Sequence, residues 1–387
     1  MSGTAGIEGL EGFLSGLSRE PDFDAPELRA YDAADLLLLE TAASSPPCAE
    51  SVVVIGDRHG ALALGAARFL GARSIRVHQD PLLSQRALEA NAARLGLDDA
   101  YEHHPLGESL LRGATLVLVQ LPRSSSELDE IAWHIARWAD PGVTVLAGGR
   151  DKHMSRSMNE VLARSFAHVA AGLGRRKARV LTASSPRSAA GLGEPRFPVR
   201  ARDRELDFDL FSFGATFGGA AFDHGSRLLL RTLREDPPPP SRRIFDLGCG
   251  NGVLATAAAL ASPEARVIAS DQSAAAVAAT RLTAAAAGVA ARVEVHRADA
   301  SEAVPDGWAE LVLLNPPFHT GSTVHAGVAH RLIRSCTRAL APGGELRLVF
   351  NSHLAYRPLV EREIGPTRQL ARDKTFTVLA ATRRALA

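Results

Sequence analysis

The chain has 387 residues, a formal net charge of +1, 46% hydrophobic residues and 22% charged residues. This composition is typical of a soluble globular protein, and the length predicts two domains, each with its own core. The balanced charge gives no overall sign of nucleic-acid binding. No apolar run approaches the roughly 18 residues that a membrane-spanning helix needs, so we expect no membrane partner.

The three cysteines, Cys48, Cys249 and Cys336, are far apart and form no CxxC pair. The N-terminus carries no charged segment followed by an apolar stretch. We therefore expect reduced thiols, no signal peptide and a cytoplasmic protein. The histidines show no spacing typical of metal ligands, so no metal site is expected.

The N-terminal half predicts an alternation of strands, helices and loops. A strand over residues 52–55 leads into a Gly-Asp-Arg-His-Gly turn at 56–60, and the stretch Gln120-Leu121-Pro122 marks a later loop. A local basic cluster follows, with Arg150, Lys152, Arg156 and the run at 175–179. This cluster is either ordinary solvated charge or a contact for an RNA backbone.

Residues 183–204 are rich in Ser, Pro, Gly and Arg and predict a linker. They separate a first domain over residues 1–182 from a second domain over residues 205–387. A hairpin over residues 205–218 and a helix starting near Asp223 are expected to lead into the second domain.

The second domain alternates strands and helices closely. We predict strands over residues 244–247, 265–270, 292–296, 311–314 and 345–350, and helices over residues 253–260, 274–287 and 326–340. Strands that alternate with helices indicate a parallel, doubly wound α/β sheet.

The two halves repeat one pattern. Residues 52–60 align with residues 244–252 at an offset of 192, Asp80 lies 191 positions before Asp271, and Gln120 begins the stretch that aligns with Asn315-Pro316-Pro317. We therefore predict two tandem doubly wound Rossmann-like domains. The N-terminal copy is degenerate and is expected to bind no cofactor.

A glycine-rich loop, with Gly248, Gly250 and Gly252, follows the strand that contains Asp246. Glycines let the backbone turn sharply and approach a ligand closely, but this pattern alone also suits a dinucleotide fold or a turn without ligand. Asp271 ends the next strand, 19 residues after Gly252. A carboxylate there can accept hydrogen bonds from both ribose hydroxyls.

Asp299 follows the third strand. Its carboxylate either accepts a hydrogen bond from an adenine amino group or only caps a loop. Together with the glycine loop and Asp271, it leaves NAD and S-adenosylmethionine both open as cofactors.

The tetrapeptide Asn315-Pro316-Pro317-Phe318 follows a buried strand, and ligands of open α/β sheets bind at the carboxyl ends of strands. Two prolines stiffen the loop. The Asn315 side-chain oxygen and the Pro316 carbonyl can accept both hydrogens of an exocyclic amine, while Phe318 stacks on its ring. These bonds favour a pyramidal nitrogen that attacks a methyl group. A dehydrogenase would need a catalytic acid that the motif lacks, so the motif favours S-adenosylmethionine.

On these residues the second domain resembles the class I S-adenosylmethionine-dependent methyltransferases. The two-copy layout resembles the bacterial ribosomal RNA guanine-N2 methyltransferases. The large-subunit (23S) enzymes are similar at residues 29–35, 177–179 and 374–379, where the small-subunit (16S) relatives match less well. The resemblance implies that Gly248, Gly250 and Asp271 bind the cofactor and that Asn315 and Phe318 hold the guanine.

The resulting hypothesis is an enzyme that methylates N2 of a guanine in ribosomal RNA, with 23S favoured over 16S and with naked RNA or a subunit as substrate. Its predicted catalytic residues are Asn315, Pro316 and Phe318, and its predicted cofactor-binding residues are Asp246, Gly248, Gly250, Gly252, Asp271 and Asp299. Methylation of adenine N6 or of a glutamine amide in a release factor is an alternative. A non-catalytic RNA-binding assembly protein with a vestigial site is another.

Overall fold

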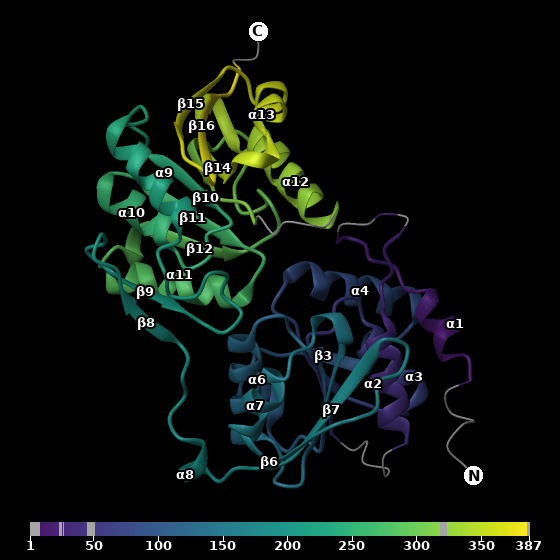
Figure 1. The fold of residues 1–387 in the computed structure, drawn as a ribbon. Helices are drawn as coiled ribbons and strands as arrows, with labels where there is room; N and C mark the ends of the chain where they lie inside the picture. Colours follow the sequence, from purple (N-terminus) through teal and green to yellow (C-terminus); the bar gives the residue numbers. More distant parts are fainter. Residues whose placement is uncertain (1–7, 23–24, 26, 45–50, 318–322, 385–387) are drawn as a thin grey trace. The chain divides into compact units, whose positions relative to one another are not determined.

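The computed structural model describes residues 8–22, 25, 27–44, 51–317 and 323–384. The chain forms two compact units, Met1–Phe197 and Pro198–Ala387, each built on a seven-stranded sheet (Figure 1). Among the described helices, none is long and apolar enough to cross a membrane.

The sheet of the first unit has the strand order β3-β2-β1-β4-β5-β7-β6. Strands β1 to β5 run parallel, and β7 pairs antiparallel with both β5 and β6. The strands are β1 (Val52–Ile55), β2 (Ile75–His78), β3 (Tyr101–His103), β4 (Leu116–Gln120), β5 (Thr144–Arg150), β6 (Phe166–Ala171) and β7 (Ala178–Pro186). The helices are α1 (Leu10–Ser15), α2 (Ala33–Ala43), α3 (Ala61–Phe69), α4 (Leu82–Leu95), α5 (Glu108–Leu111), α6 (Ser125–Trp138), α7 (Ser157–Ala163) and α8 (Ala189–Leu192).

The sheet of the second unit repeats this order as β12-β11-β10-β13-β14-β16-β15, which confirms the predicted duplication. Its strands are β10 (Arg243–Leu247), β11 (Arg266–Asp271), β12 (Val293–Arg297), β13 (Ala309–Leu314), β14 (Leu340–Asn351), β15 (Thr367–Arg372) and β16 (Phe376–Thr382). Its helices are α9 (His224–Glu235), α10 (Val253–Ala261), α11 (Ala274–Ala286), α12 (Thr323–Ala339) and α13 (Arg357–Glu363). A separate hairpin is formed by β8 (Val199–Arg202) and β9 (Asp209–Ser212).

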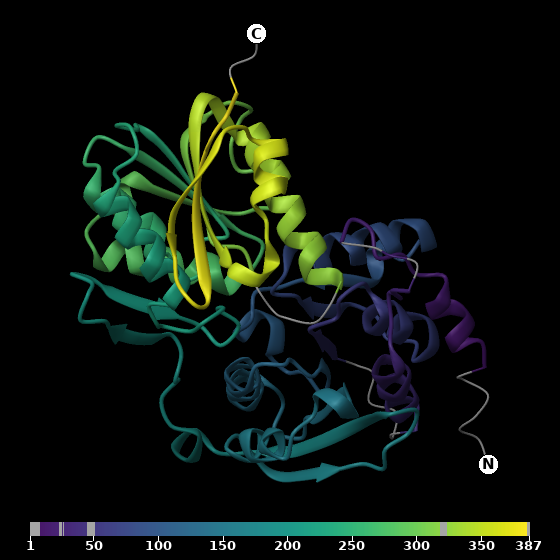
Figure 2. The same cartoon turned by 45° about the horizontal axis from the view of Figure 1, so that its top comes forward.

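Each sheet has a hydrophobic core on both faces. In the second unit, Ile244 of β10 packs with α9, α10 and α11 on one face, while Phe245 packs with α12 and α13 on the other. Figures 1 and 2 show these helices on the two sides of the sheet. Successive side chains of such a parallel strand are buried on opposite faces of the sheet, which explains its continuous apolar sequence. The arrangement confirms a doubly wound α/β fold.

The segment predicted as a linker, 183–204, is partly built into both units. Strand β7 continues to Pro186 because it pairs with β5 and β6, and β8 pairs with β9. The hairpin therefore covers residues 199–212 instead of the predicted 205–218. The alternation of apolar residues that predicts a hairpin comes from the buried side chains of Leu206, Phe208 and Leu210. Strand β8 instead carries exposed arginines, which do not predict a strand.

Candidate active site

The predicted site residues that the structure describes lie at the carboxyl ends of β10, β11 and β13, except Asp299, which follows β12. Strand β10 lies between β11 and β13, so the winding of the sheet reverses beside β10. Open α/β sheets bind ligands at such a reversal. Leu247 pairs with Leu314 in the parallel ladder. The glycine loop that starts at Gly248 and the loop that starts at Asn315 therefore leave the sheet side by side.

The glycine loop turns through left-handed backbone angles, with φ of 79° at Gly248, 55° at Gly250 and 81° at Gly252. Residues with a side chain rarely adopt such angles. The Gly248 amide donates to the Ser270 carbonyl at 2.8 Å, and the Thr280 hydroxyl donates to the Gly250 carbonyl at 3.1 Å. The loop is thus held between β11 and α11, with its backbone bare of side chains at three positions.

Replacing Gly252 by alanine is expected to destabilise the protein more than Gly248→Ala. A Cβ at Gly252 would lie 2.8 Å from the Thr280 Cα, whereas a Cβ at Gly248 would meet nothing within 4 Å. Both variants carry the left-handed cost of about 1–2 kcal/mol, so their difference isolates the clash between the loop and α11. Thermal unfolding without cofactor should give the lower melting temperature for Gly252→Ala. Equal melting temperatures would contradict a tight loop–helix contact.

Asp271 at the end of β11 is held from two directions. Its Oδ2 accepts the Gly250 amide at 3.1 Å and its Oδ1 accepts the Ser273 amide at 3.0 Å. The side chain is half-buried, and a carboxylate oxygen can accept more than one hydrogen bond. The loop and the start of α11 therefore fix the orientation of the carboxylate.

Asp246 lies within β10 and is fully buried. Its Oδ2 accepts the Ala255 amide at 2.9 Å, but its Oδ1 has no hydrogen-bond partner. Burial raises the pKa of Asp246 to about 7, and the negative charge of Asp271 adds to this. Asp246 precedes Gly248 by two residues, and a cation bound at the site would stabilise the ionised form of this unpartnered carboxyl group. The site therefore fits the positive charge of S-adenosylmethionine.

The raised pKa of Asp246 predicts a loss of stability as pH rises. The unfolded chain releases the proton near its usual pKa of 3.8, whereas the folded chain keeps it up to about 7. Between these values the folded state binds more protons, so the free energy of unfolding falls as pH increases. In Asp246→Asn this fall should be smaller by on the order of 2 kcal/mol. Chemical denaturation at about pH 5 and about pH 8 measures it, and identical pH dependence in both proteins would refute the assignment.

Asp299 is buried and ion-paired. Its Oδ2 lies against the Arg331 guanidinium of α12, and its backbone amide donates to Glu302 Oε2 at 3.2 Å. The sequence predicted an acceptor for an adenine amino group at this position. The arginine already engages one oxygen of the carboxylate, so any adenine contact would involve Asp299 together with Arg331.

Asn315 is oriented by the first turn of α9. Its Nδ2 donates to Asp223 Oδ1 at 3.2 Å and to Ser226 Oγ at 2.9 Å. Both amide hydrogens are thereby used, so the network assigns the remaining atom, Oδ1, as the acceptor. Asp223 is fixed in turn as the N-cap of α9, where its side chain accepts the Ser226 amide. The acceptor role predicted for Asn315 is thus set by its neighbours.

The sequence predicts a helix start near Asp223, but no short motif connects it with Asn315, 92 residues away. Gly225 lies against this contact, since a Cβ there would lie 3.2 Å from Asp223 Oδ1, 3.4 Å from Asn315 Oδ1 and 3.4 Å from the Phe376 ring. Phe376 of β16 is therefore an aromatic side chain beside Asn315 that the sequence did not single out. Pro316 is buried, and the predicted stacking residue Phe318 lies outside the described residues.

The first unit keeps the framework of this site but not its chemistry. Ile55 pairs with Val119 as Leu247 pairs with Leu314, so Gln120 stands in register with Asn315. Its amide also donates to the start of a helix, at Asp35 Oδ1.

The glycine loop of the first unit is filled by its own side chains. Asp57 accepts the amides of Gly60, Leu62 and Ala63 and so caps α3. The ladder between β1 and β2 places Gln79, and not Asp80 as the sequence alignment suggested, at the position of Asp271. An amide there cannot offer a ribose the two acceptor oxygens of a carboxylate.

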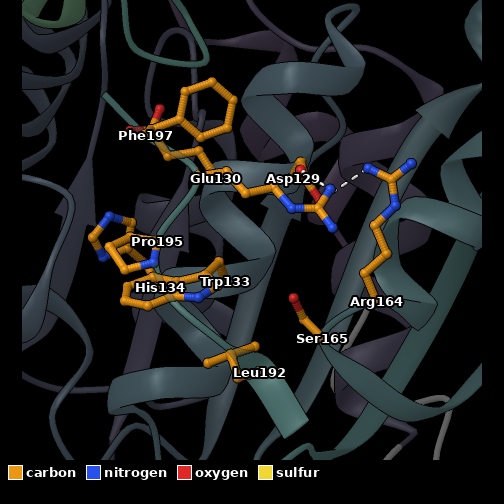
Figure 3. Close-up of a pocket in the computed structure, with 10 residues that line it drawn as sticks. Asp129, Glu130, Trp133, His134, Arg164, Ser165, Leu192, Pro195 and Phe197 are labelled. Atoms are coloured by element: carbon orange, nitrogen blue, oxygen red, sulfur yellow. Dashed lines mark hydrogen bonds and ion pairs between the residues drawn. The ribbon is translucent and has the colours of Figure 1, made fainter. Parts of the chain in front are cut away.

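A separate hollow of the first unit contains none of the predicted site residues (Figure 3). It has a volume of about 30 Å³, enough for a water molecule. Three of its charged lining residues are engaged with one another, because Asp129 pairs with Arg164 at 3.3 Å and with Arg196 at 3.0 Å. Among the residues that the structure describes, no group of His, Cys, Asp or Glu side chains could hold a metal ion.

Comparison with known proteins identifies the family. The methyltransferase small domain family matches residues 207–380 and the RLMG N-terminal domain family matches residues 11–187. The ribosomal RNA large subunit methyltransferase G of Pseudomonas entomophila is 35% identical over 94% of this chain and 96% of its own length. The chain belongs to the ribosomal RNA large subunit methyltransferase G family. The family member of Streptomyces coelicolor is 33% identical over 95% of this chain and 97% of its own length.

A solved structure agrees with the fold of this methyltransferase G family member. A T. thermophilus 16S rRNA N2 methyltransferase, solved in complex with AdoMet and guanosine, superposes with a TM-score of 0.74. The match covers 95% of this chain and 100% of that one at 20% identity. This likeness extends over both units and confirms the tandem architecture.

Proposed function

We propose that this chain transfers a methyl group from S-adenosylmethionine to N2 of a guanine in the RNA of the large ribosomal subunit. The observation that carries the proposal is the fixed orientation of Asn315, whose amide nitrogen is used by Asp223 and Ser226. The amide oxygen is left to accept a proton-bearing amine at the carboxyl edge of the sheet.

The residues of the second unit divide the work between cofactor and base. Asp271 would hold the ribose of S-adenosylmethionine, and the glycine loop would lie against the part of the cofactor next to the ribose. Asp246 would face the positive charge of the cofactor. When bound, S-adenosylmethionine supplies a methyl group on a sulfonium, which makes the methyl electrophilic. Asn315 Oδ1 and the Pro316 carbonyl would accept the two hydrogens of the guanine amine. This pairing holds the nitrogen lone pair toward the methyl group and contributes mainly by positioning.

The target guanine must leave any base-paired RNA helix that it occupies before its amine can reach Asn315. The ring of Phe376 near Asn315 supports a flat ligand at this place. Phe318 remains the stacking residue predicted from the sequence. The remaining residues of the predicted site would act through these contacts.

The choice of the large-subunit RNA is supported by the names and the near-complete coverage of the relatives. Incubation with labelled S-adenosylmethionine and unmodified 23S or 16S RNA tests it, as naked RNA and as assembled subunits. We expect incorporation into 23S RNA and little into 16S RNA. Preferential labelling of 16S RNA would overturn the substrate assignment, and failure to bind S-adenosylmethionine in calorimetry would point to a vestigial site.

A further inference from the structure

Helix α12 contacts the loop between β12 and β13 through two of its arginines. Arg331 forms an ion pair with Asp299 at the start of this loop. Arg338 donates from Nε to Ser301 Oγ at 3.0 Å and from Nη2 to the Val304 carbonyl at 3.0 Å. Seven residues make about two helical turns, so both arginines lie on the face of α12 that packs against the loop. Arg338 binds the body of the loop, whereas Arg331 binds a single carboxylate.

This carboxylate lies beside the one proposed to hold the ribose. Strands β11 and β12 pair in parallel as far as Asp271 and Arg297. The next residue, Ala298, still donates its amide to the Asp271 carbonyl at 3.0 Å. Asp299 therefore follows beside Asp271 at the carboxyl edge of the sheet. The base of an adenosine is attached to its ribose, so a cofactor bound at Asp271 brings its base near Asp299.

A turn fixes the backbone at Asp299. Its amide donates to Glu302 Oε2 at 3.2 Å, and its carbonyl accepts the Glu302 amide at 3.0 Å. The next residue, Ala300, has a φ of 47°, in the left-handed region that residues with a side chain rarely adopt. Strained backbone of this kind is found mainly at ligand-binding and catalytic sites. The turn is therefore typical of a ligand site.

The ion pair joins a buried carboxylate to a more exposed cation. Only 12% of the Asp299 side chain is exposed, against 41% of the Arg331 side chain. Removal from water disfavours the charged form of a carboxyl group, and a neighbouring cation favours it. Arg331 supplies that cation, so the pair favours an ionised carboxylate. An ionised carboxylate accepts hydrogen bonds and donates none.

We propose that Arg331 is a positioning residue of the cofactor site, which holds Asp299 as an acceptor for the amino group of adenine and so selects adenine over a base with an oxygen at that position. This inference rests on the proposed function for its cofactor. The arginine contacts Oδ2 of Asp299, and the other oxygen, Oδ1, accepts the amine. Hypoxanthine carries a carbonyl oxygen in place of the amine, and its lone pairs repel an ionised carboxylate.

Calorimetry on the full-length protein tests this with two ligands, S-adenosylhomocysteine and S-inosylhomocysteine, which differ only where adenine carries its amino group. The native protein should bind the adenine ligand roughly 10–10²-fold more tightly, the usual effect of one hydrogen bond to a charged group. In Arg331→Ala this ligand should bind roughly tenfold more weakly, the coupling expected between residues in contact, and the hypoxanthine ligand nearly as before. Equal weakening of both ligands, or an unchanged preference, would overturn the proposal.

Three further variants make the test specific. Arg331→Lys keeps the charge and should restore most of the preference for adenine. Arg334→Ala removes an exposed charge of the same helix, which pairs with Glu363 at 3.5 Å, and should bind both ligands as the native protein does. Asp299→Asn replaces one oxygen by a donor and should lose the preference. Adding Arg331→Ala to Asp299→Asn should lower the affinity no further, and a full additional loss would overturn the proposal.

Failure of this inference is distinguishable from failure of the proposed function, because the binding experiments need no RNA. A protein that selects adenine through Arg331 but transfers no methyl group to 23S RNA would overturn only the proposed function. A protein that methylates the RNA while its preference for adenine is independent of Arg331 would overturn only the inference. Binding of neither ligand by the native protein would overturn both.

Discussion

Asn315→Ala should lower turnover by roughly 10²–10³-fold, the usual effect of removing one preorganised polar group that acts on the reacting atoms. The dissociation constant of S-adenosylmethionine should change little, because Asn315 lies beyond the glycine loop and bonds to α9. Single-turnover methylation at saturating RNA measures the first quantity and calorimetry the second. An equal loss of both would mean that Asn315 is structural.

Two control variants sharpen this prediction. Gln120→Ala alters the residue that holds the same register position in the first unit and should leave turnover unchanged. Ser226→Ala removes one of the two acceptors that orient the Asn315 amide and should give an intermediate loss in kcat. A Ser226→Ala protein with full kcat would contradict the view that α9 sets the orientation of the amide.

Asp271→Ala is expected to act on the other half of the reaction. Hydrogen bonds to a charged group are worth about 1.5–3 kcal/mol each, so loss of the carboxylate should weaken S-adenosylmethionine binding roughly 10²-fold. The loss includes the Gly250 and Ser273 amides, which would lose their acceptor. At saturating cofactor, kcat should fall far less.

Asp271→Asn provides the comparison for this variant. Its amide oxygen can still accept one of the two backbone amides, but its NH₂ group cannot accept from a ribose. Cofactor affinity should therefore fall between those of the native protein and Asp271→Ala. Unchanged affinity in Asp271→Ala would remove Asp271 from the cofactor site.

The fold was largely predictable because its signals are local. The apolar runs before Gly248 and Asn315 are buried parallel strands, and the constant offset between the halves reflects two sheets with one strand order. The predicted bounds of the hairpin were wrong, because β8 is formed by its pairing with β9 and has no apolar pattern of its own. The linker was overestimated for a similar reason, because β7 extends through sheet pairing.

The chemistry of the site was only partly predictable. Asn315 and Asp271 stand out by their positions at strand ends, but the orientation of Asn315 depends on Ser226, 89 residues away. The ion pair between Asp299 and Arg331 likewise joins residues that no short motif relates.

The central claim is that the second unit methylates the exocyclic amine of a guanine held by Asn315. Nucleoside mass spectrometry of unmodified 23S RNA, after incubation with the protein and S-adenosylmethionine, tests it most directly. The account predicts N2-methylguanosine at one position with the native protein and none with Asn315→Ala. A product methylated on adenine N6, or equal amounts of N2-methylguanosine from both proteins, would contradict it.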